Sequence, residues 1–337
     1  MKKSLKKSLL IACDRSPDTG EGKLFLSIAN ELSKRSEIKI YSDVVTSYFE
    51  TVKFLQDRVL PIYLFFVALL MSIKYEKVYF INYAPLWAWW LGFLDRAGVI
   101  IGPITGSISA VPLKKDLMSL FVRVWMQKLM CGLHISILDK KKFKWAATKS
   151  VEKFLRSNGL QKVLYAPPAM LQISENKERK KTDEFDLFIY SSRHAIKNND
   201  FLNRLMEALI RETELKIVYI GPDADRYLST PKVVSFFSLS ETEFDQLLLK
   251  SRCYLTVSFE DAGITFLKSL SFGLNVVCKS GVGFCVADCQ SCFKYERMEI
   301  NEILQKIDEA NSIVSDEKDF LNGLRAKTLN CFNNWAE

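Results

Sequence analysis

The chain is poor in the residues and segments that mark several classes of protein. Its 337 residues include only two histidines, His134 and His194. No apolar run reaches the roughly 18–20 positions that a membrane-spanning helix needs. The basic beginning is followed by an apolar run too short for export, so we expect residues 8–13 to form the first buried strand. These absences argue against a membrane-spanning protein and against an exported one.

The eight cysteines form no evident disulfide framework. Four of them lie close together, Cys278, Cys285, Cys289 and Cys292, but only the last two have the spacing of metal ligands. Because no second pair and no histidine accompanies them, ordinary small thiols are favoured over a structural metal site. We therefore expect reduced cysteines, a cytoplasmic protein and no metal.

The composition indicates a globular protein with two domains. Hydrophobic residues make up 48% of the chain and charged residues 26%, which is typical of a folded protein and not of a disordered one. The length suffices for two domains of about 150 residues, each with its own core. The net charge of +8 fits attraction to an anionic membrane or to a phosphate-bearing substrate, and nearly as well a basic surface without a specific partner.

Expected strands and helices alternate through both halves of the chain, which is typical of βαβ units with a parallel sheet. In the first half we expect strands at 8–13, 38–42, 77–82, 98–102 and 144–147, and helices at 23–34, 86–94 and 150–157. In the second half we expect strands at 186–191, 216–221, 233–236, 253–257 and 275–278, and helices at 200–213, 241–250, after 263, at 301–313 and at 316–335. The prolines at 167 and 168 and a polar run at 174–184 separate the halves, so we place the boundary near Tyr165.

Two apolar segments bear on a membrane role. Residues 60–73 are nearly all apolar but too few to span a bilayer, so a buried core helix is the better interpretation. In residues 117–133 apolar side chains recur at helical spacing, with Arg123 and Lys128 between them and lysines on both sides. This pattern fits a helix at a membrane interface, and it also fits a surface helix that covers a sheet. The tryptophan cluster at 87–90 fits a membrane-facing surface or a buried cluster.

Residues 257–278 indicate a ligand site. An apolar strand runs into the acidic turn 260–263, a helix follows and ends at Gly273, and a second buried strand begins at Asn275. The start of such a helix presents free backbone N–H groups and a positive dipole end at the carboxyl edge of a parallel sheet. Phosphorylated ligands bind at that edge.

Glu260, Gly263 and Gly273 stand in the register of the nucleotide-sugar motif of the GT-B glycosyltransferases, and the chain resembles their large retaining group. That motif carries two glutamates eight residues apart, and Lys268 stands where the second should be. A lysine has only hydrogen-bond donors, so it cannot accept bonds from the ribose hydroxyls that this glutamate clasps. Either the ribose is held differently, the donor is unusual, activity is weak, or the chain has lost catalysis.

The resemblance implies an α/β protein with two Rossmann-like domains facing a cleft. Residues 1–165 would form the acceptor-side domain and residues 166–318 the nucleotide-sugar domain. The last helix, in residues 319–337, would cross back to the first domain. The resemblance also implies a retaining transfer without a metal, in which the leaving phosphate helps to deprotonate the acceptor.

Site residues follow from the same resemblance. Arg193 and Lys197, directly after an apolar strand, would grip the donor diphosphate, because a guanidinium forks two phosphate oxygens and an ammonium adds a compact second charge. Glu260 would lie by the donor sugar, and the backbone of Gly263, Ile264 and Thr265 would offer N–H groups to phosphate and sugar. We expect Glu260, Arg193 and Lys197 to carry catalysis. The alternative for the cationic pair is an ordinary basic loop.

Signals in the rest of the chain are weaker. The family approaches the donor phosphate through a Gly-rich loop where this chain has Gly20 and Gly22, although a plain turn explains these residues equally well. Many relatives have a histidine near 102–106, this chain has none there, and His134 is better explained as structural. The paired carboxylates of a glycoside hydrolase are not evident. Residues 223–225 read Asp-Ala-Asp, which is better explained as a polar turn than as a metal site.

Together these observations predict a glycosyltransferase that moves a sugar from a nucleotide-diphosphate sugar to a glycan acceptor. We expect a lipid-linked acceptor, as in bacterial surface polysaccharide or lipopolysaccharide (O-antigen or capsule) biosynthesis. The inner membrane surface would be a further partner, nucleic acid would not, and no cofactor is needed beside the donor substrate. Two alternatives stay open: a non-catalytic scaffold of a polysaccharide assembly complex, and a sugar-nucleotide epimerase of the same fold.

Overall fold

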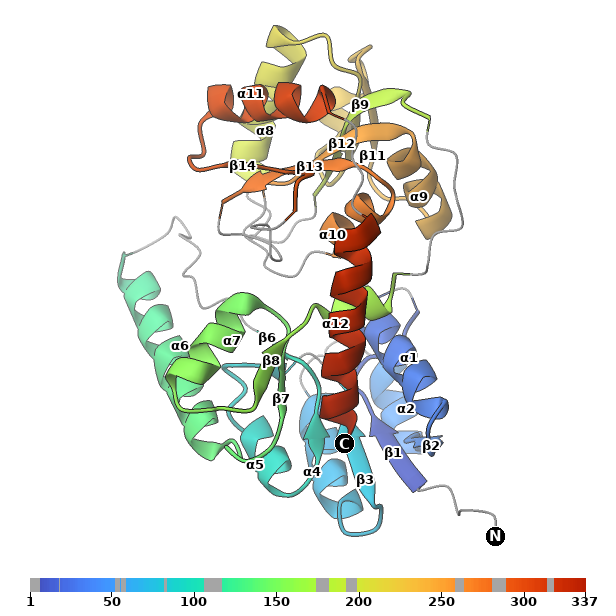
Figure 1. Cartoon of the computed structure of the whole chain (residues 1–337), viewed down its shortest axis with the longest axis vertical. Helices are drawn as coiled ribbons and strands as arrows, with labels where there is room; N and C mark the ends of the chain where they lie inside the picture. Colours follow the sequence, from blue (N-terminus) through green and yellow to red (C-terminus); the bar gives the residue numbers. More distant parts are fainter. Residues whose placement is uncertain are drawn as a thin grey trace. The chain divides into compact units, whose positions relative to one another are not determined.

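The computed structural model describes residues 7–17, 19–51, 55, 59–81, 84–105, 117–173, 182–191, 199–257, 264–280, 289–313 and 318–337. Contacts divide the chain into two compact units, Met1–Gln172 with Arg325–Glu337, and Ile173–Leu324. Each unit has parallel strands with helices beside them (Figure 1). The expected α/β class with two Rossmann-like domains is confirmed.

A parallel sheet with the strand order β2-β1-β3-β5 forms the centre of the first unit. Its strands are β1 (Lys7–Ile11), β2 (Glu37–Ile40), β3 (Lys77–Phe80) and β5 (Ile100–Ile101). Side chains alternate between the two faces of the sheet, so Leu9 and Ile11 belong to one buried cluster and Leu10 to another. Both faces are therefore covered by helices.

The helices on the Leu9 face are α4 (Leu60–Met71), α5 (Leu91–Arg96) and α6 (Leu117–Ile137), and α2 (Val44–Thr51) contacts α4. The opposite face is covered by α1 (Gly20–Ser33) and by the end of α12 (Lys318–Ala336). The expectation of a buried core helix at 60–73 is correct for only one side of α4. Leu64 and Val67 are buried, whereas Phe66 and Leu70 are exposed, because the helix has a sheet on one side only.

A second parallel sheet, with the order β4-β6-β7-β8, completes the first unit. Its strands are β4 (Ala84–Pro85), β6 (Ile104–Thr105), β7 (Lys144–Ala146) and β8 (Val163–Tyr165), followed by the 3-10 helix η1 (Pro168–Leu171). The helix α7 (Lys149–Ser157) lies between β7 and β8 in the chain, and Thr148 caps it by accepting the Val151 N–H at 3.2 Å.

The last turns of α12 belong to the core of the first unit. Phe332 and Trp335 pack edge-on against Trp145 of β7. Trp335 Nε1 donates to the carbonyl of Ile101 at 2.7 Å, and the hydroxyl of Tyr79 donates to the carbonyl of Ala336 at 2.9 Å. Residues 325–337 are thus part of the first hydrophobic core although they come last in the chain.

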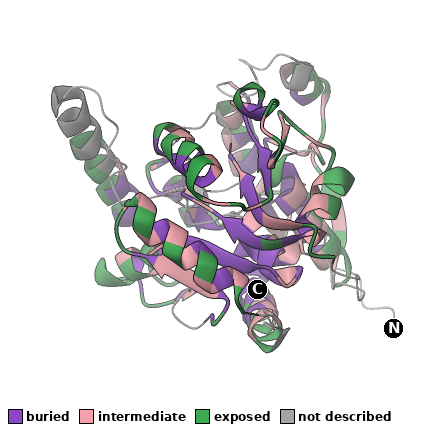
Figure 2. Ribbon diagram, turned by 90° about the horizontal axis from the view of Figure 1, so that it is seen from above, coloured by how far each residue is buried: buried purple, intermediate pink, exposed green. Residues whose placement is uncertain are grey.

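One six-stranded parallel sheet with the order β11-β10-β9-β12-β13-β14 forms the centre of the second unit. Its strands are β9 (Phe185–Tyr190), β10 (Ile217–Ile220), β11 (Val233–Phe236), β12 (Ser251–Leu255), β13 (Asn275–Lys279) and β14 (Cys292–Tyr295). Its helices are α8 (Asn199–Glu212), α9 (Glu241–Leu249), α10 (Ile264–Ser271), α11 (Ile300–Asn311) and the 3-10 helix η3 (Ala224–Tyr227). In both units the strands are mostly buried and the helices carry exposed residues on their outer sides (Figure 2).

Candidate functional site

The order of strands in the second sheet reverses between β9 and β12. Counted along this unit the order is 3-2-1-4-5-6, which is the order of dinucleotide-binding sheets. β9 and β12 are parallel neighbours, with Leu187 beside Cys253 and Ile189 beside Leu255, so both strands end at the same edge. Ligands of open α/β sheets bind outside the carboxyl ends of the strands at such a reversal.

The segments that carry most of the predicted site residues leave the sheet at this edge. Residues 192–198 follow β9 and residues 258–263 follow β12, so Arg193, Lys197, Glu260 and Gly263 lie outside the described residues. Their described neighbours are held by the sheet: the Ser191 N–H donates to the carbonyl of Ile220 at 2.8 Å, and Thr256 N–H to that of Val277 at 3.0 Å. Both segments therefore start from strand ends that lie side by side, and the roles of the four residues stay predictions.

Helix α10 begins directly after the second of these segments. Ile264 and Thr265 form its first turn and are half-buried, while Leu267 and Leu270 pack into the unit. The first N–H groups of a helix have no partner within the helix, and they carry the positive end of its dipole. Ile264 and Thr265 thus lie where an anion would be favoured, and their contact with a donor stays a prediction.

Lys268 of α10 is paired with two carboxylates of α9. Its ammonium lies 2.5 Å from Asp245 Oδ1 and 3.1 Å from Glu241 Oε1, and its side chain is only 19% exposed. The two acidic residues are four positions apart, so they share one face of α9. The lysine in place of the expected glutamate is therefore matched by acidic groups on the neighbouring helix.

Sequence reasoning missed Glu241 and Asp245. Their spacing on a helix that starts with a Ser240-x-x-Glu243 capping box was the available signal, but local spacing does not reveal which side chain of another helix they meet. A cavity of about 490 Å³ lies along this face of α9 and is lined by Glu241, Thr242, Asp245, Gln246 and Leu249. The acidic pair is thus next to space that a ligand can enter.

In the first unit, α1 begins against the loop that follows β1. Thr19 caps this helix, because its Oγ1 accepts the N–H of Gly22 at 3.0 Å. A Cβ on Gly22 would lie 1.9 Å from the carbonyl oxygen of Ser16, whereas a Cβ on Gly20 would meet no described atom within 4 Å. Gly22, a predicted donor-binding residue, is therefore required for the close approach of helix and loop. Its contact with a donor stays a prediction.

Tyrosines surround a carboxylate just after β2, also at a carboxyl edge. Asp43 accepts bonds from the hydroxyl of Tyr41 at 2.5 Å, from the hydroxyl of Tyr63, and from the Thr46 N–H at 2.6 Å. Burial alone would raise the pKa of Asp43, but these bonds outweigh burial and hold the pKa well below its usual range. Burial and the bond to Asp43 raise the pKa of Tyr41, so the cluster is one carboxylate held by neutral phenols.

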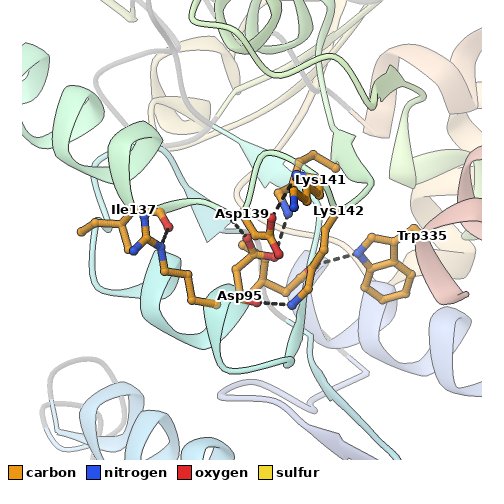
Figure 3. A network of polar contacts seen from close by, with 9 residues as sticks. Asp95, Ile137, Asp139, Lys141, Lys142 and Trp335 are labelled. Atoms are coloured by element: carbon orange, nitrogen blue, oxygen red, sulfur yellow. Dashed lines mark hydrogen bonds and ion pairs between the residues drawn. The ribbon is translucent and has the colours of Figure 1, made fainter.

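Figure 3 shows a second polar network, around Asp95 of α5. The buried carboxylate pairs with the buried ammonium of Lys144 at 2.8 Å and accepts the Asp139 N–H at 2.7 Å. Burial lowers the pKa of Lys144, and the charge of Asp95 counteracts this. A cavity of about 360 Å³ beside the network is lined by Lys77, Ile100 and Lys144, which begin β3, β5 and β7. Because this is the amino edge of the strands, we interpret the network as structural.

Two findings concern the part of the chain that the structure describes. It holds no group of three or more His, Cys, Asp or Glu side chains suited to a metal ion. Cys289 and Cys292 are not joined by a disulfide, and the Cys292 thiol donates to Cys289 Sγ at 3.0 Å. Asp223 accepts a bond from Asn203 at 3.1 Å. Among the same residues no helix combines the length and the apolarity that crossing a bilayer requires.

No protein-family model and no curated protein matches the chain. Solved structures do match it over nearly its full length. One is a glycosyltransferase from Rickettsia africae, with 14% identity over 99% of this chain and 96% of the other and a TM-score of 0.55. Another is WaaG, a glycosyltransferase involved in lipopolysaccharide biosynthesis, with 12% identity over 98% and 94% and a TM-score of 0.52.

The UDP-GlcNAc 2-epimerase of Methanocaldococcus jannaschii, solved with UDP-GlcNAc and UDP, is similar to the same degree. It has 13% identity over 96% of this chain and 100% of the other, and a TM-score of 0.56. At these identities the likeness shows the fold. The fold is GT-B, as the resemblance of the sequence implied.

Proposed function

We propose that the protein is a sugar-nucleotide enzyme, specifically a glycosyltransferase that moves a sugar from a nucleotide-diphosphate sugar to a glycan acceptor. The reversal of strand order between β9 and β12 carries this proposal. It sets the ends of β9 and β12 side by side at the edge where phosphorylated ligands bind, and segments 192–198 and 258–263 follow these strands in the chain. Arg193 and Lys197 are in the first segment, and Glu260 is in the second.

The proposed chemistry uses charges of opposite sign. Arg193 and Lys197 would neutralise the charge that develops on the diphosphate as its bond to the sugar breaks. Glu260 would accept bonds from hydroxyls of the donor sugar, and the first turn of α10 would offer N–H groups of Ile264 and Thr265. We further propose that transfer is retaining and independent of metal, with the leaving phosphate taking the proton of the acceptor.

In this proposal the α9 carboxylates take over ribose binding from the missing glutamate. Lys268 cannot accept a hydrogen bond, but the side chain of Glu241, 3.1 Å from its ammonium, is 58% exposed. We predict that Glu241→Ala weakens binding of the nucleoside diphosphate about tenfold, the effect of losing one hydrogen bond to a charged group. Titration calorimetry checks this, with Glu212→Ala on α8 as the control. Equal affinity of both variants and the unchanged protein would contradict the role of Glu241.

The proposed acceptor is a lipid-linked glycan of bacterial surface polysaccharide or lipopolysaccharide biosynthesis, used at the inner face of the plasma membrane. The likeness to WaaG supports this, and so does the net charge of +8. The experiment supplies UDP-, GDP- and dTDP-sugars with and without lipid-linked glycan and analyses the products. Sugar on the glycan, lost in Arg193→Ala/Lys197→Ala with the fold intact, is the expected result. Unchanged turnover in that double variant would refute the diphosphate role.

An epimerase is the second candidate, because solved epimerases are as similar to the chain as the glycosyltransferases are. An epimerase needs no acceptor, so incubation with the sugar nucleotide alone separates the two activities. A changed sugar on the nucleotide would identify an epimerase. A non-catalytic scaffold, suggested by Lys268, would give neither product, and titration with nucleoside diphosphates would show no heat.

A further inference from the structure

Exposed apolar side chains of the first unit gather on one layer of helices. Among the described residues of the first unit, the large exposed apolar side chains other than Leu26 and Ile40 lie on or beside α2, α4, α5 and α6. Each of these helices contacts the next in that order, and α4, α5 and α6 share the buried cluster on one face of the sheet. Their exposed residues therefore lie on the sides turned away from the core.

We define the outer apolar face by its exposed residues at α4, α5 and α6: Ile62, Phe66, Leu70, Ile73, Phe93, Trp125, Met126, Leu129 and Leu133. On α4 they recur every three or four positions, opposite the buried Leu64 and Val67. Phe66 is 58%, Leu70 62% and Trp125 56% exposed. A group of exposed apolar side chains of this extent on a globular protein marks a binding surface.

The charges around the outer apolar face are mostly positive. Helix α4 contains no charged residue, and between Trp125 and the end of α6 at Ile137 the one ionisable side chain on the exposed side is that of Lys128. The exposed charges at or shortly after the ends of α4, α5 and α6 in the chain are Lys74, Arg96, Lys140 and Lys141, against Glu76. An apolar surface with a cationic border complements a surface that is negatively charged outside and apolar inside.

We propose that the outer apolar face binds the surface of an anionic lipid bilayer, with α4 and α6 lying in the plane of the membrane. The link to a lipid-linked acceptor rests on the proposed function. Trp125 fits this placement, since tryptophan is enriched at membrane interfaces. A second copy of the chain fits less well, because a two-fold contact would set this face against itself and bring its lysines together.

Sedimentation with vesicles tests this inference on the full chain. Vesicles of phosphatidylglycerol with phosphatidylethanolamine are compared with vesicles of phosphatidylcholine alone. We expect binding to the anionic vesicles, weakened at least about tenfold in Phe66→Asp/Leu70→Asp and in Leu129→Asp/Leu133→Asp. Lys140→Glu/Lys141→Glu should weaken the preference for anionic lipid by a similar factor, at about fivefold per lysine. The matched control is Leu228→Asp/Phe237→Asp, two exposed residues of the second unit.

Two results would overturn the inference: unchanged binding of the face variants, or no preference of the unchanged protein for anionic vesicles. Concentration-dependent dimers that the same substitutions dissociate, without vesicle binding, would assign the face to a second copy instead. Thermal stabilisation by nucleoside diphosphates is measured on every variant. It reports on the proposed donor site in the second unit, so failure of membrane binding and failure of the enzyme proposal are distinguishable.

Discussion

Two glycines at the start of α1 differ in what their surroundings allow. We predict that Gly22→Ala destabilises the protein by about 1–3 kcal/mol, because its Cβ would overlap the Ser16 carbonyl and helix and loop must separate. Gly20→Ala in the same turn should be neutral or stabilising by up to about 1 kcal/mol, since alanine is the better helix former. Chemical denaturation measures the free energy of unfolding of both variants. An equal change in the two would contradict the close approach of helix and loop at Gly22.

His134 is a structural residue of the first core, as expected from the sequence. It is fully buried, and its Nδ1–H donates to the carbonyl of Leu86 at 3.0 Å. Burial lowers its pKa from 6.5, against smaller effects of Leu86 and Asp95. In the unfolded chain the imidazole takes up a proton at about pH 6.5, the ordinary pKa of histidine. Acid therefore favours the unfolded chain.

The consequence is a pH dependence of stability with a definite sign. The contribution of neutral His134 to the free energy of unfolding is present above about pH 6.5 and is lost as the pH falls towards the lowered pKa of the folded state. His134→Gln, which keeps a donor for Leu86 and does not titrate, should flatten this dependence. Denaturant unfolding between pH 7.5 and 5 measures how the free energy of unfolding changes with pH. The same dependence in the unchanged protein and in His134→Gln would contradict the lowered pKa of His134.

At the scale of elements, α12 contributes its last turns to the first core. We predict that Trp335→Ala lowers the free energy of unfolding by about 3–5 kcal/mol, because it removes a buried indole and leaves the Ile101 carbonyl without its bond. Asn334→Ala, at the exposed position beside it, should change stability by less than about 0.5 kcal/mol. Denaturant unfolding separates the variants. If both had the same small effect, these turns would not be part of the core.

Several elements of the second unit were predictable from the sequence, because their apolar residues are the ones that the structure buries. Each of the strands β9, β10, β12 and β13 contains an uninterrupted run of at least three apolar residues, and α8 shows a clear apolar periodicity. The strands β4, β6, β8 and β14 were not predicted, whereas the equally short β5 and β7 lie within the expected strands at 98–102 and 144–147. β4 and β6 have two residues each and β8 three, too few to show a period, and β14 contains Lys294 between apolar neighbours.

Parts of the candidate site could not be predicted from patterns within single helices or strands. The pairing of Lys268 with Glu241 and Asp245 depends on how α9 and α10 pack, which no spacing within either helix encodes. The exposed half of α4 was missed because an apolar run does not reveal how many neighbours will cover it. The parallel direction of the strands, in contrast, agrees with the expected alternation of strands and helices, whereas their order in the sheet was not predicted.

At the scale of the whole molecule, the two units have different candidate binding features. The second unit has the strand reversal where a diphosphate would bind, with Lys268 and its acidic partners on adjacent helices. The first unit has a tyrosine-bound carboxylate at a carboxyl edge and an apolar, cation-bordered outer face. This division fits an enzyme that takes a water-soluble donor in one domain and a lipid-linked acceptor in the other.

Binding of a nucleoside diphosphate tests whether Arg193 and Lys197 hold the donor diphosphate. UDP, GDP and dTDP are titrated calorimetrically into the unchanged protein, into Arg193→Ala/Lys197→Ala, and into the control Arg211→Ala/Lys250→Ala, which removes two exposed cations elsewhere in the second unit. We expect one of them to bind. The first variant should raise its Kd at least about hundredfold through two lost charge-assisted contacts, and the control should leave the Kd unchanged. Equal Kd values in all three proteins would contradict the diphosphate role of Arg193 and Lys197.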